Sequence, residues 1–461
     1  MTVEKPAPDA RTSSSFNIMR HLAILGAHPA AMAYSMTTLG AGMMNSIFNF
    51  YYVKLFLDKY KIPEGAFYQS QVVYMIWNAV NDPLFGYLQD NSRVACCSRR
   101  RLSILYGAPF YALAFLLAWF PWRLYTSEIS SHHQSRLRLI KYNQVASLVG
   151  SSSVLFCGLL SSNMDYFPAF QGFTVLVAVL ACGCMMYTGV HSESRFEGKG
   201  STFGSSGSDD QSPSQSALSF SAVTSMTWQI LGNRDFQLFV LMNFFQVFML
   251  AFCNNFTMIF AEHLIPPDVL PSLAKSFMYG AGFICPQMLV LSSQSLLHSL
   301  GYYKIILCTF YIEAGMAVLM LLLGPHHYYI LALFLTTNMV IIQAAFSLFN
   351  LPLADIIDSD LHQHKRSSPL SSMVFGTNAL FTKPAQSLAP MMVVTILNQF
   401  GYEELKEAGS RASPGALESL HSVMFYLVCV LPMCVAALQA LAWRPFSIRN
   451  SHTVDTKYID G

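Results

Sequence analysis

Eleven long apolar runs recur along this chain, and they decide most of what it can fold into. An α-helix needs about 20 predominantly apolar residues to cross the hydrocarbon core of a bilayer. Runs of this length span a membrane as helices, because lipid offers no partners for free backbone groups. The sequence therefore predicts an all-α, polytopic membrane protein with about 11 transmembrane helices. The runs lie near residues 30–56, 66–88, 102–122, 144–162, 168–190, 236–263, 274–298, 303–324, 328–353, 371–399 and 417–443.

Composition agrees with this class and excludes several others. Hydrophobic residues make up 53% of the chain and charged residues 11%, whereas a soluble domain carries about 25% charge. The net charge is +2 and the basic residues are dispersed, so no nucleic-acid partner is expected. The cysteines have no metal-ligand spacing, and no nucleophile–base set or phosphate loop is present. We expect no enzyme activity, no metal site and no cofactor.

One polar stretch divides the apolar runs into two groups. Residues 191–234 contain "GKGSTFGSSGSDDQSPSQS", a composition typical of a flexible loop. Two membrane halves joined by a long central loop are typical of transporters built from repeats. The predicted organisation is an N-terminal helical half (1–190), the central loop (191–234), a C-terminal helical half (235–445) and a polar tail (446–461).

The basic loops reveal a missing crossing. Basic residues at 93–101 and again at 136–141 both favour the cytosolic side, yet a single apolar run (102–122) separates them. The remaining segment, "RLYTSEISSHHQS" (123–135), is too short and too polar to cross. Either the chain has an odd topology, with termini on opposite sides, or it is a variant form that lacks the fourth helix of a twelve-helix parent.

The second apolar run ends in an unusual group of polar side chains. Asn78 and Asp82 are four residues apart with Asn81 beside them, so all three share about 100° of a helix face. An aspartate in mid-membrane costs about 2.5–3.5 kcal/mol and faces a partner or a wet cavity. The oxygens of these side chains suit a hard cation such as Na⁺. The alternative is that they only join helices through hydrogen bonds.

A second polar row lies in the tenth run. Asn378, Thr382 and Gln386 are spaced four residues apart, and Lys383 precedes Pro384. A proline at this position predicts a kink in the helix. A lysine within an apolar run needs a counter-charge, and its pair can serve either as a structural ion pair or as a substrate-coupled switch.

Two motif blocks resemble a known family. "WNAVNDPLFGYLQDNSR" (77–93) is similar to the second helix and following loop of the glycoside–pentoside–hexuronide:cation symporters, the melibiose-permease-like branch of the major facilitator superfamily. "LADIIDSDLHQHKR" (353–366) and "FGTNALFTKPAQSLAP" (375–390) resemble its tenth helix, loop and eleventh helix. The resemblance extends over residues 30–440 and implies a two-half bundle that works as a secondary transporter.

The resemblance also implies roles for particular residues. It brings the eleventh helix towards the second, with Lys383 within reach of Asp82, and implies coupling to Na⁺ or H⁺. The implied cation and substrate site consists of Asn78, Asn81, Asp82, Lys383, Thr382 and Asn378. The implied gate loops contain Asp90, Arg93, Asp355, Asp358, Lys365 and Arg366.

The chain also departs from the family pattern. The segment 37–48 has Asn45 as its only strong polar group where the family's first helix has a sugar-binding aspartate, and Asn78 stands at a second acidic position. The main hypothesis is a cation- or proton-coupled, symporter-like transporter of an unknown small molecule in the plasma membrane. Its substrate can be lysolipid-like instead of a sugar, because relatives in this branch carry lysophospholipids. The alternative is a transport-inactive membrane scaffold or surface protein, which the missing helix favours.

Overall fold

The computed structural model describes residues 29–91, 100–120, 138–161, 164, 166–191, 227–364, 371–402 and 414–448, and it confirms the all-α fold class. The first helices are α2 (Pro29–Lys54), its π-helical extension η1 (Leu55–Lys59), α3 (Glu64–Asn91), α5 (Arg100–Trp119), α6 (Arg138–Ser161) and α7 (Phe167–His191). The later helices are α9 (Arg234–Leu264), α10 (Ser272–Ser292), α11 (Gln294–Leu323), α12 (Tyr328–Leu348), α13 (Asn350–Gln363), α14 (Ser371–Thr382), α15 (Pro384–Gln399) and α17 (Pro414–Trp443). Each predicted run coincides with one of these helices or with a consecutive pair of them.

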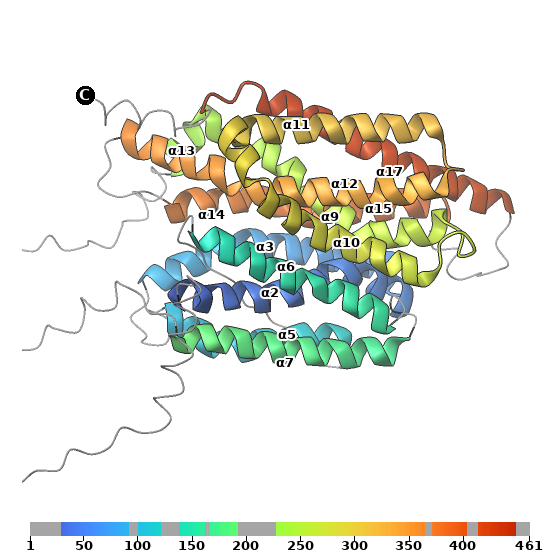
Figure 1. The fold of residues 1–461 in the computed structure, drawn as a ribbon, viewed down its shortest axis with the longest axis horizontal. Helices are drawn as coiled ribbons and strands as arrows, with labels where there is room; N and C mark the ends of the chain where they lie inside the picture. The colour runs from blue at the N-terminus through green and yellow to red at the C-terminus, as the bar shows by residue number, and fades with distance from the viewer. Residues whose placement is uncertain are drawn as a thin grey trace, which may run out of the picture.

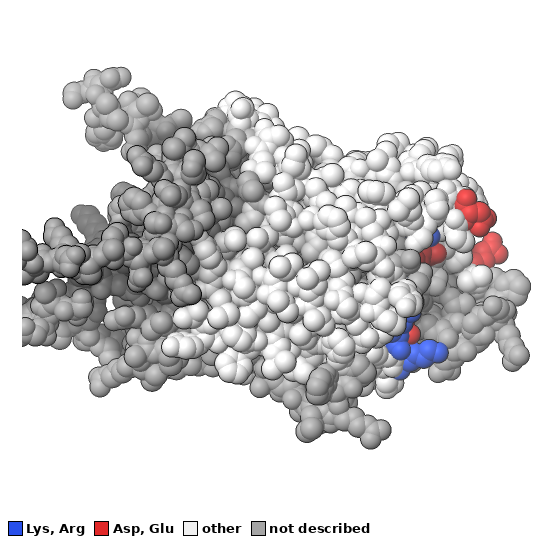
Figure 2. All heavy atoms as spheres, turned by 60° about the horizontal axis from the view of Figure 1, so that its bottom comes forward, with Lys and Arg blue, Asp and Glu red and all other residues white. Residues whose placement is uncertain are grey.

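The helices are long and apolar enough for a polytopic membrane protein. In the described part of the chain, six of them satisfy both the length and the hydropathy of a membrane span: Phe167–Val190, Arg234–Leu264, Ser299–Leu323, Tyr328–Gln363, Met373–Gln399 and Leu417–Trp443. On the face drawn in Figure 2, the coloured charged side chains gather at one end, beside a broad uncharged band. A band of this kind is what a lipid environment requires. The chain is thus an integral, multi-pass membrane protein.

Local sequence signals account for several helix ends. The Asn233 side chain accepts hydrogen bonds from the first backbone N–H groups of α9, at 2.9 and 3.3 Å, as a good N-cap residue does. Gly324 ends α11 at φ 82°, and Gly301 interrupts the same helix at φ 75°, a region that glycine enters without a Cβ clash. Pro384 begins α15 and divides it from α14, so the kink predicted from the sequence is confirmed.

The helices form one bundle with two groups of neighbours. In Figure 1 the helices α2, α5, α6 and α7 lie together below, and the helices from α9 onward lie above them. Aromatic rings join the two groups, because Phe50 of α2 contacts Tyr279 and Phe283 of α10 at centroid distances of 5.3 and 5.4 Å. Leu155 of α6 lies directly against Gly280 of α10, where any Cβ would clash. The bundle is therefore tightly packed between its groups as well as within them.

The packing pattern of the first group recurs in the second, with one exception. The helix α2 packs on α6 and α7 as α9 packs on α15 and α17, and α5 packs on α7 as α11 packs on α17. In the second group α12 fills the space among α9, α10 and α11. No helix in the described part of the first group takes the equivalent place. The helix α3 packs mainly on α14 and α15 instead.

The helices α5 and α6 run in the same direction. Gln171 of α7 donates its Nε2 to the Trp119 carbonyl at 2.9 Å, and Leu105 lies against Gly189, so α5 is antiparallel to α7. The helix α6 ends at Ser161 and α7 begins at Phe167, and with so short a separation these two helices are antiparallel as well. The end of α5 and the start of α6 therefore lie at opposite ends of the bundle, with residues 121–137 outside the described part.

This arrangement differs from the one that eleven consecutive spans would give, with the first and last helices ending on opposite sides. Asn255 bonds to Tyr52 and Glu262 to Lys54, which makes α9 parallel to α2. Gln439 of α17 donates to the Met242 carbonyl near the start of α9, at 3.4 Å. The start of α2 and the end of α17 consequently lie at the same end of the bundle. Consecutive spans normally alternate in direction, but α5 and α6 run in the same direction, so the chain changes direction once less than eleven alternating spans would.

Candidate functional site

A partly buried hydrogen bond joins α3 to α15 midway along α3. Asn78 is 8% exposed, and its Nδ2 donates to Gln386 Oε1 at 2.9 Å. The two side chains come from helices that the family resemblance places in different halves, the second and the eleventh. The expected proximity of these two helices is confirmed by their packing.

Two further bonds continue this seam towards the start of α3. Tyr68 and Thr395 share a hydrogen bond between hydroxyls at 2.7 Å. Asn398 donates its Nδ2 to Glu64 Oε2 at 2.7 Å. As the residue numbers rise on α3 they fall on α15, so the two helices are antiparallel with a constant register.

The same register locates the other residues of the predicted site. One helical turn beyond Asn78, it sets Asp82 level with Thr382 and Lys383. The backbone of Asp82 belongs to α3, but its side chain and that of Asn81 lie outside the described residues. The predicted approach of Lys383 to Asp82 is compatible with the register and stays a prediction.

The polar side chains predicted to form one row on the tenth run contact two different neighbouring helices, α3 and α9. Thr382 is buried, and its hydroxyl donates to the Asn378 carbonyl one turn earlier, at 2.9 Å. The Asn378 Oδ1 accepts from Asn243 of α9 at 3.1 Å. Gln386 therefore faces α3, whereas Asn378 is bound to α9, and the structure does not gather the whole row around one point.

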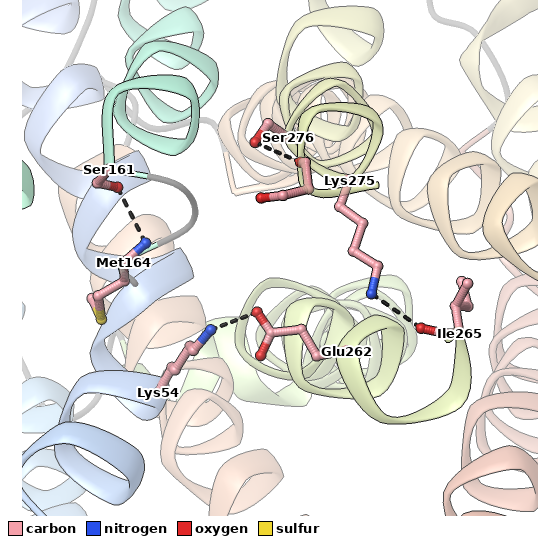
Figure 3. Close-up of polar contacts among 8 residues, drawn as sticks. Lys54, Ser161, Met164, Glu262, Ile265, Lys275 and Ser276 are labelled. Atoms are coloured by element: carbon pink, nitrogen blue, oxygen red, sulfur yellow. Dashed lines mark hydrogen bonds and ion pairs between the residues drawn. The ribbon is translucent and has the colours of Figure 1, made fainter. Parts of the chain in front are cut away.

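The sequence analysis missed a charged contact between α2 and α9, which lies at the end of the bundle where both helices finish. Lys54 Nζ lies 2.5 Å from Glu262 Oε1, with side-chain exposures of 7% and 32%. Figure 3 shows this pair between α2 and α9, with Lys275 nearby donating to the Ile265 carbonyl at 3.0 Å. The signal was a single charged residue at the end of each apolar run, which is easily assigned to the membrane surface.

Two of the predicted gate-loop residues, Asp355 and Asp358, have described side chains, and both lie on α13. The Tyr302 hydroxyl of α11 donates to Asp355 Oδ2 at 2.6 Å and also contacts the Ile448 carbonyl at 3.1 Å. Asp358 is exposed at the surface of α13. The residues or side chains outside the described part are Asp90, Arg93, Lys365 and Arg366.

The bond between Asn78 and Gln386 can be measured directly. Each of the single changes Asn78→Leu and Gln386→Leu removes it, and together with the double variant they form a thermodynamic cycle. Because hydrogen bonds between membrane helices average about 0.6 kcal/mol and reach about 1.7 kcal/mol, we expect a coupling free energy in this range from reversible unfolding. Thr336→Val in α12, which loses only a bond to its own helix, should show no coupling to either change. Additive effects of Asn78→Leu and Gln386→Leu would exclude the bond.

Comparison with known proteins identifies relatives over nearly the full length. Transmembrane protein 180 of Gallus gallus is 29% identical over 489 aligned positions, covering 94% of this chain and 95% of the relative. Transmembrane protein 180 of Mus musculus is 27% identical over 487 positions, covering 92% and 93%. Among solved structures, the nucleoside transporter NupG matches 92% of each chain with a TM-score of 0.42 and 11% identity.

A family profile gives the broader assignment. The profile described as MFS/sugar transport protein matches residues 33–128 and 121–444, which is most of the chain. The membrane-spanning helices and the packing of α3 against α14 and α15 agree with the motifs that carried the resemblance. The chain belongs to the MFS/sugar transport protein family of the major facilitator superfamily.

Proposed function

We propose that this protein is a secondary transporter of a small molecule in the plasma membrane, working by rocking of its N-terminal half (1–190) against its C-terminal half (235–445). The observation that carries the proposal is the partly buried bond between Asn78, itself a buried side chain, and Gln386. Polar side chains buried in mid-membrane between two halves are where transporters of this architecture bind substrate and ion. The membership in a transport family supports the same conclusion.

The proposed coupling site extends one turn from this bond. Asp82, with Asn78 and Asn81, would bind Na⁺ or H⁺, and Lys383 would couple that ion to an anionic or zwitterionic substrate. The antiparallel register that sets Asp82 level with Lys383 supports this assignment. Binding of a cation would compete with the lysine for the carboxylate, which links ion occupancy to the contact between the halves.

The coupling ion can be tested without knowing the substrate. A ligand that binds only the folded protein stabilises it by about 2.7 kcal/mol at 100 times its Kd. We therefore expect a change of Na⁺ concentration or of pH to shift the Tm of the purified protein by about 2–5 °C. Asp82→Asn should abolish the shift that identifies the coupling ion.

The matched control is Asp268→Asn, which removes a carboxylate from an exposed turn outside the site. It should keep the full ion-dependent shift. The coupling proposal fails if neither ion affects the unmodified protein, or if Asp82→Asn responds as strongly as the control.

A second candidate function rests on a different observation. The parallel helices α5 and α6, with no helix described between them, favour a transport-inactive scaffold or surface protein for this form of the chain. The two candidate functions can be distinguished by inserting a further helix between α5 and α6. A transporter needs the complete bundle and should respond to the insertion, whereas a scaffold should not.

A further inference from the structure

A glutamate lies in the core of the C-terminal helices, away from the site at α3. Glu313 is 2% exposed, although it stands in the middle of α11 (Gln294–Leu323), in one of the most apolar spans of the chain. It belongs to a buried stripe at helical spacing, and all the remaining members of this stripe are apolar. The other members are Ile306, Phe310, Ala317 and Met320.

Glu313 shares its depth with a second buried polar residue. Glu313 precedes the end of α11 at Leu323 by ten residues, and Asn338 follows the start of α12 at Tyr328 by ten residues. The two helices pack together and are joined by a short turn, so these residues are level. Ten residues of helix rise about 15 Å, which is the middle of a hydrocarbon core about 30 Å thick.

The hydrogen bonds of both residues are incomplete. Glu313 Oε1 and Asn338 Oδ1 are buried and have no hydrogen-bond partner. Asn338 is 4% exposed, and its Nδ2 reaches only the sulfur of Cys253, at 3.9 Å. Two acceptor oxygens without donors at one level of a protein interior call for an explanation, because such groups are rare in folded proteins.

The contacts of Glu313 do not include a counter-charge among the described residues. In the described part of the chain no ion pair joins it to a basic side chain. A titratable group that interacts with Glu313 is the buried thiol of Cys253 from α9. An isolated carboxylate in an apolar interior is so costly that the group takes a proton instead. A metal cation is a poorer occupant, since hard cations need about six oxygen ligands, whereas the unpartnered acceptors identified at this level in the described residues are Glu313 Oε1 and Asn338 Oδ1.

We infer that Glu313, with Asn338 beside it and Cys253 near both, forms a proton-binding site in the middle of the C-terminal half. The bound proton turns one acceptor oxygen of Glu313 into a donor and removes its charge. This site is separate from Asn78 and Asp82 at the seam of α3. Its occupancy is independent of the proposed transport, whereas its use in coupling would rest on that function.

Infrared spectroscopy tests the occupancy directly. Protonated and ionised carboxyl groups absorb at different carbonyl frequencies, so the protonated form of Glu313 should give its own band. Spectra are recorded on full-length protein at neutral pH, in a detergent without ester groups, whose carbonyls would overlap. The difference between unmodified protein and Glu313→Gln should contain the band of one protonated carboxylic acid. Glu262→Gln is the matched control and should lose ionised-carboxylate absorption instead, because Glu262 is paired with Lys54.

Three further arms keep the inference falsifiable. Glu313→Asp should retain a protonated-acid band, and Asn338→Leu should shift its frequency, since the acid loses a neighbour. A pH titration of the unmodified protein should remove the band only at alkaline pH, which tests the site even if Glu313→Gln fails to fold. An ionised carboxylate at neutral pH would overturn the inference. So would a band present in choline buffer and absent in Na⁺ buffer, because it would show a metal cation in place of the proton.

Discussion

Replacing Glu262 by glutamine is expected to open the end of the bundle that its ion pair with Lys54 closes. The lysine is buried, so removing the Glu262 carboxylate takes a counter-charge away from a desolvated ammonium group. Breaking a fully buried pair costs about 3–5 kcal/mol, and the partial exposure of Glu262 reduces this to about 2–3 kcal/mol. Because Lys54 belongs to α2 and Glu262 to α9, most of this cost falls on the closed arrangement. The ratio of closed to open molecules should drop by roughly 30- to 150-fold.

Pulsed electron resonance between two spin labels can measure this opening. Lys59 at the end of η1 and Asp268 in the turn before α10 are both exposed, and labels there report the separation of α2 from α9 and α10. In a cysteine-free background, Glu262→Gln and Lys54→Met should both lengthen the distance. Glu418→Gln, at an exposed position of α17, should leave it unchanged.

The charge-swapped variant distinguishes an ion pair from simple loss of packing. Combining Lys54→Glu with Glu262→Lys restores opposite charges across the same contact. The short distance should return in the double variant. A distance distribution that is the same in all variants would show that the pair does not hold the two groups of helices together.

The sequence predicted the fold because the bilayer allows few alternatives to long apolar helices. The division at Pro384 was predictable as well, since proline removes a backbone donor and fixes the local geometry. The break at Gly301 was not, because a glycine inside an apolar run marks a kink only when tertiary packing requires one there.

The site was predicted in part, and the misses have physical causes. The pairing of Asn78 with the tenth run followed from the motifs, but nothing local in the sequence decides that Gln386 turns to α3 and Asn378 to α9. The pair of Lys54 with Glu262 joins residues 208 positions apart, so only the fold shows it. Glu313 was overlooked because counting apolar residues tolerates one charge per run, although an acid in such a run is itself a signal of function.

Several observations support the prediction that this chain lacks the fourth helix of a twelve-helix parent. The alignment with the Gallus gallus relative covers 489 positions, more than the 461 residues here, so the relative has residues without a counterpart in this chain. The family profile matches in two pieces that meet at residues 121–128. Among the described helices of the first group none is equivalent to α12, and α5 is parallel to α6. The 17 residues at 121–137 would rise only about 26 Å as a helix, less than a bilayer core of about 30 Å.

Restoring a helix between Phe120 and Arg138 is expected to change the topology of the whole chain. The inserted segment is a designed apolar helix of about 20 residues, long enough to cross the bilayer core. In lipid, eleven consecutive spans would put the termini on opposite sides, which conflicts with a bundle whose first and last helices share one end. Twelve spans remove the conflict. Epitope tags at the two termini should therefore label from opposite sides in the present chain and from the same, cytosolic side after the insertion.

The insertion should also raise the yield of monodisperse protein several-fold, because a chain that can complete its packing escapes degradation more often. A Gly/Ser insert of equal length is the matched control, and it should change neither the labelling nor the yield, since it adds length without a span. Same-side labelling of the present chain, with no gain from the insert, would contradict the missing helix and leave one of the predicted apolar runs outside the membrane. The transporter and the inactive scaffold separate in the same experiment, since the ion-dependent shift in Tm expected of the transporter should persist and increase with the twelfth span, whereas a scaffold should show no shift before or after the insertion.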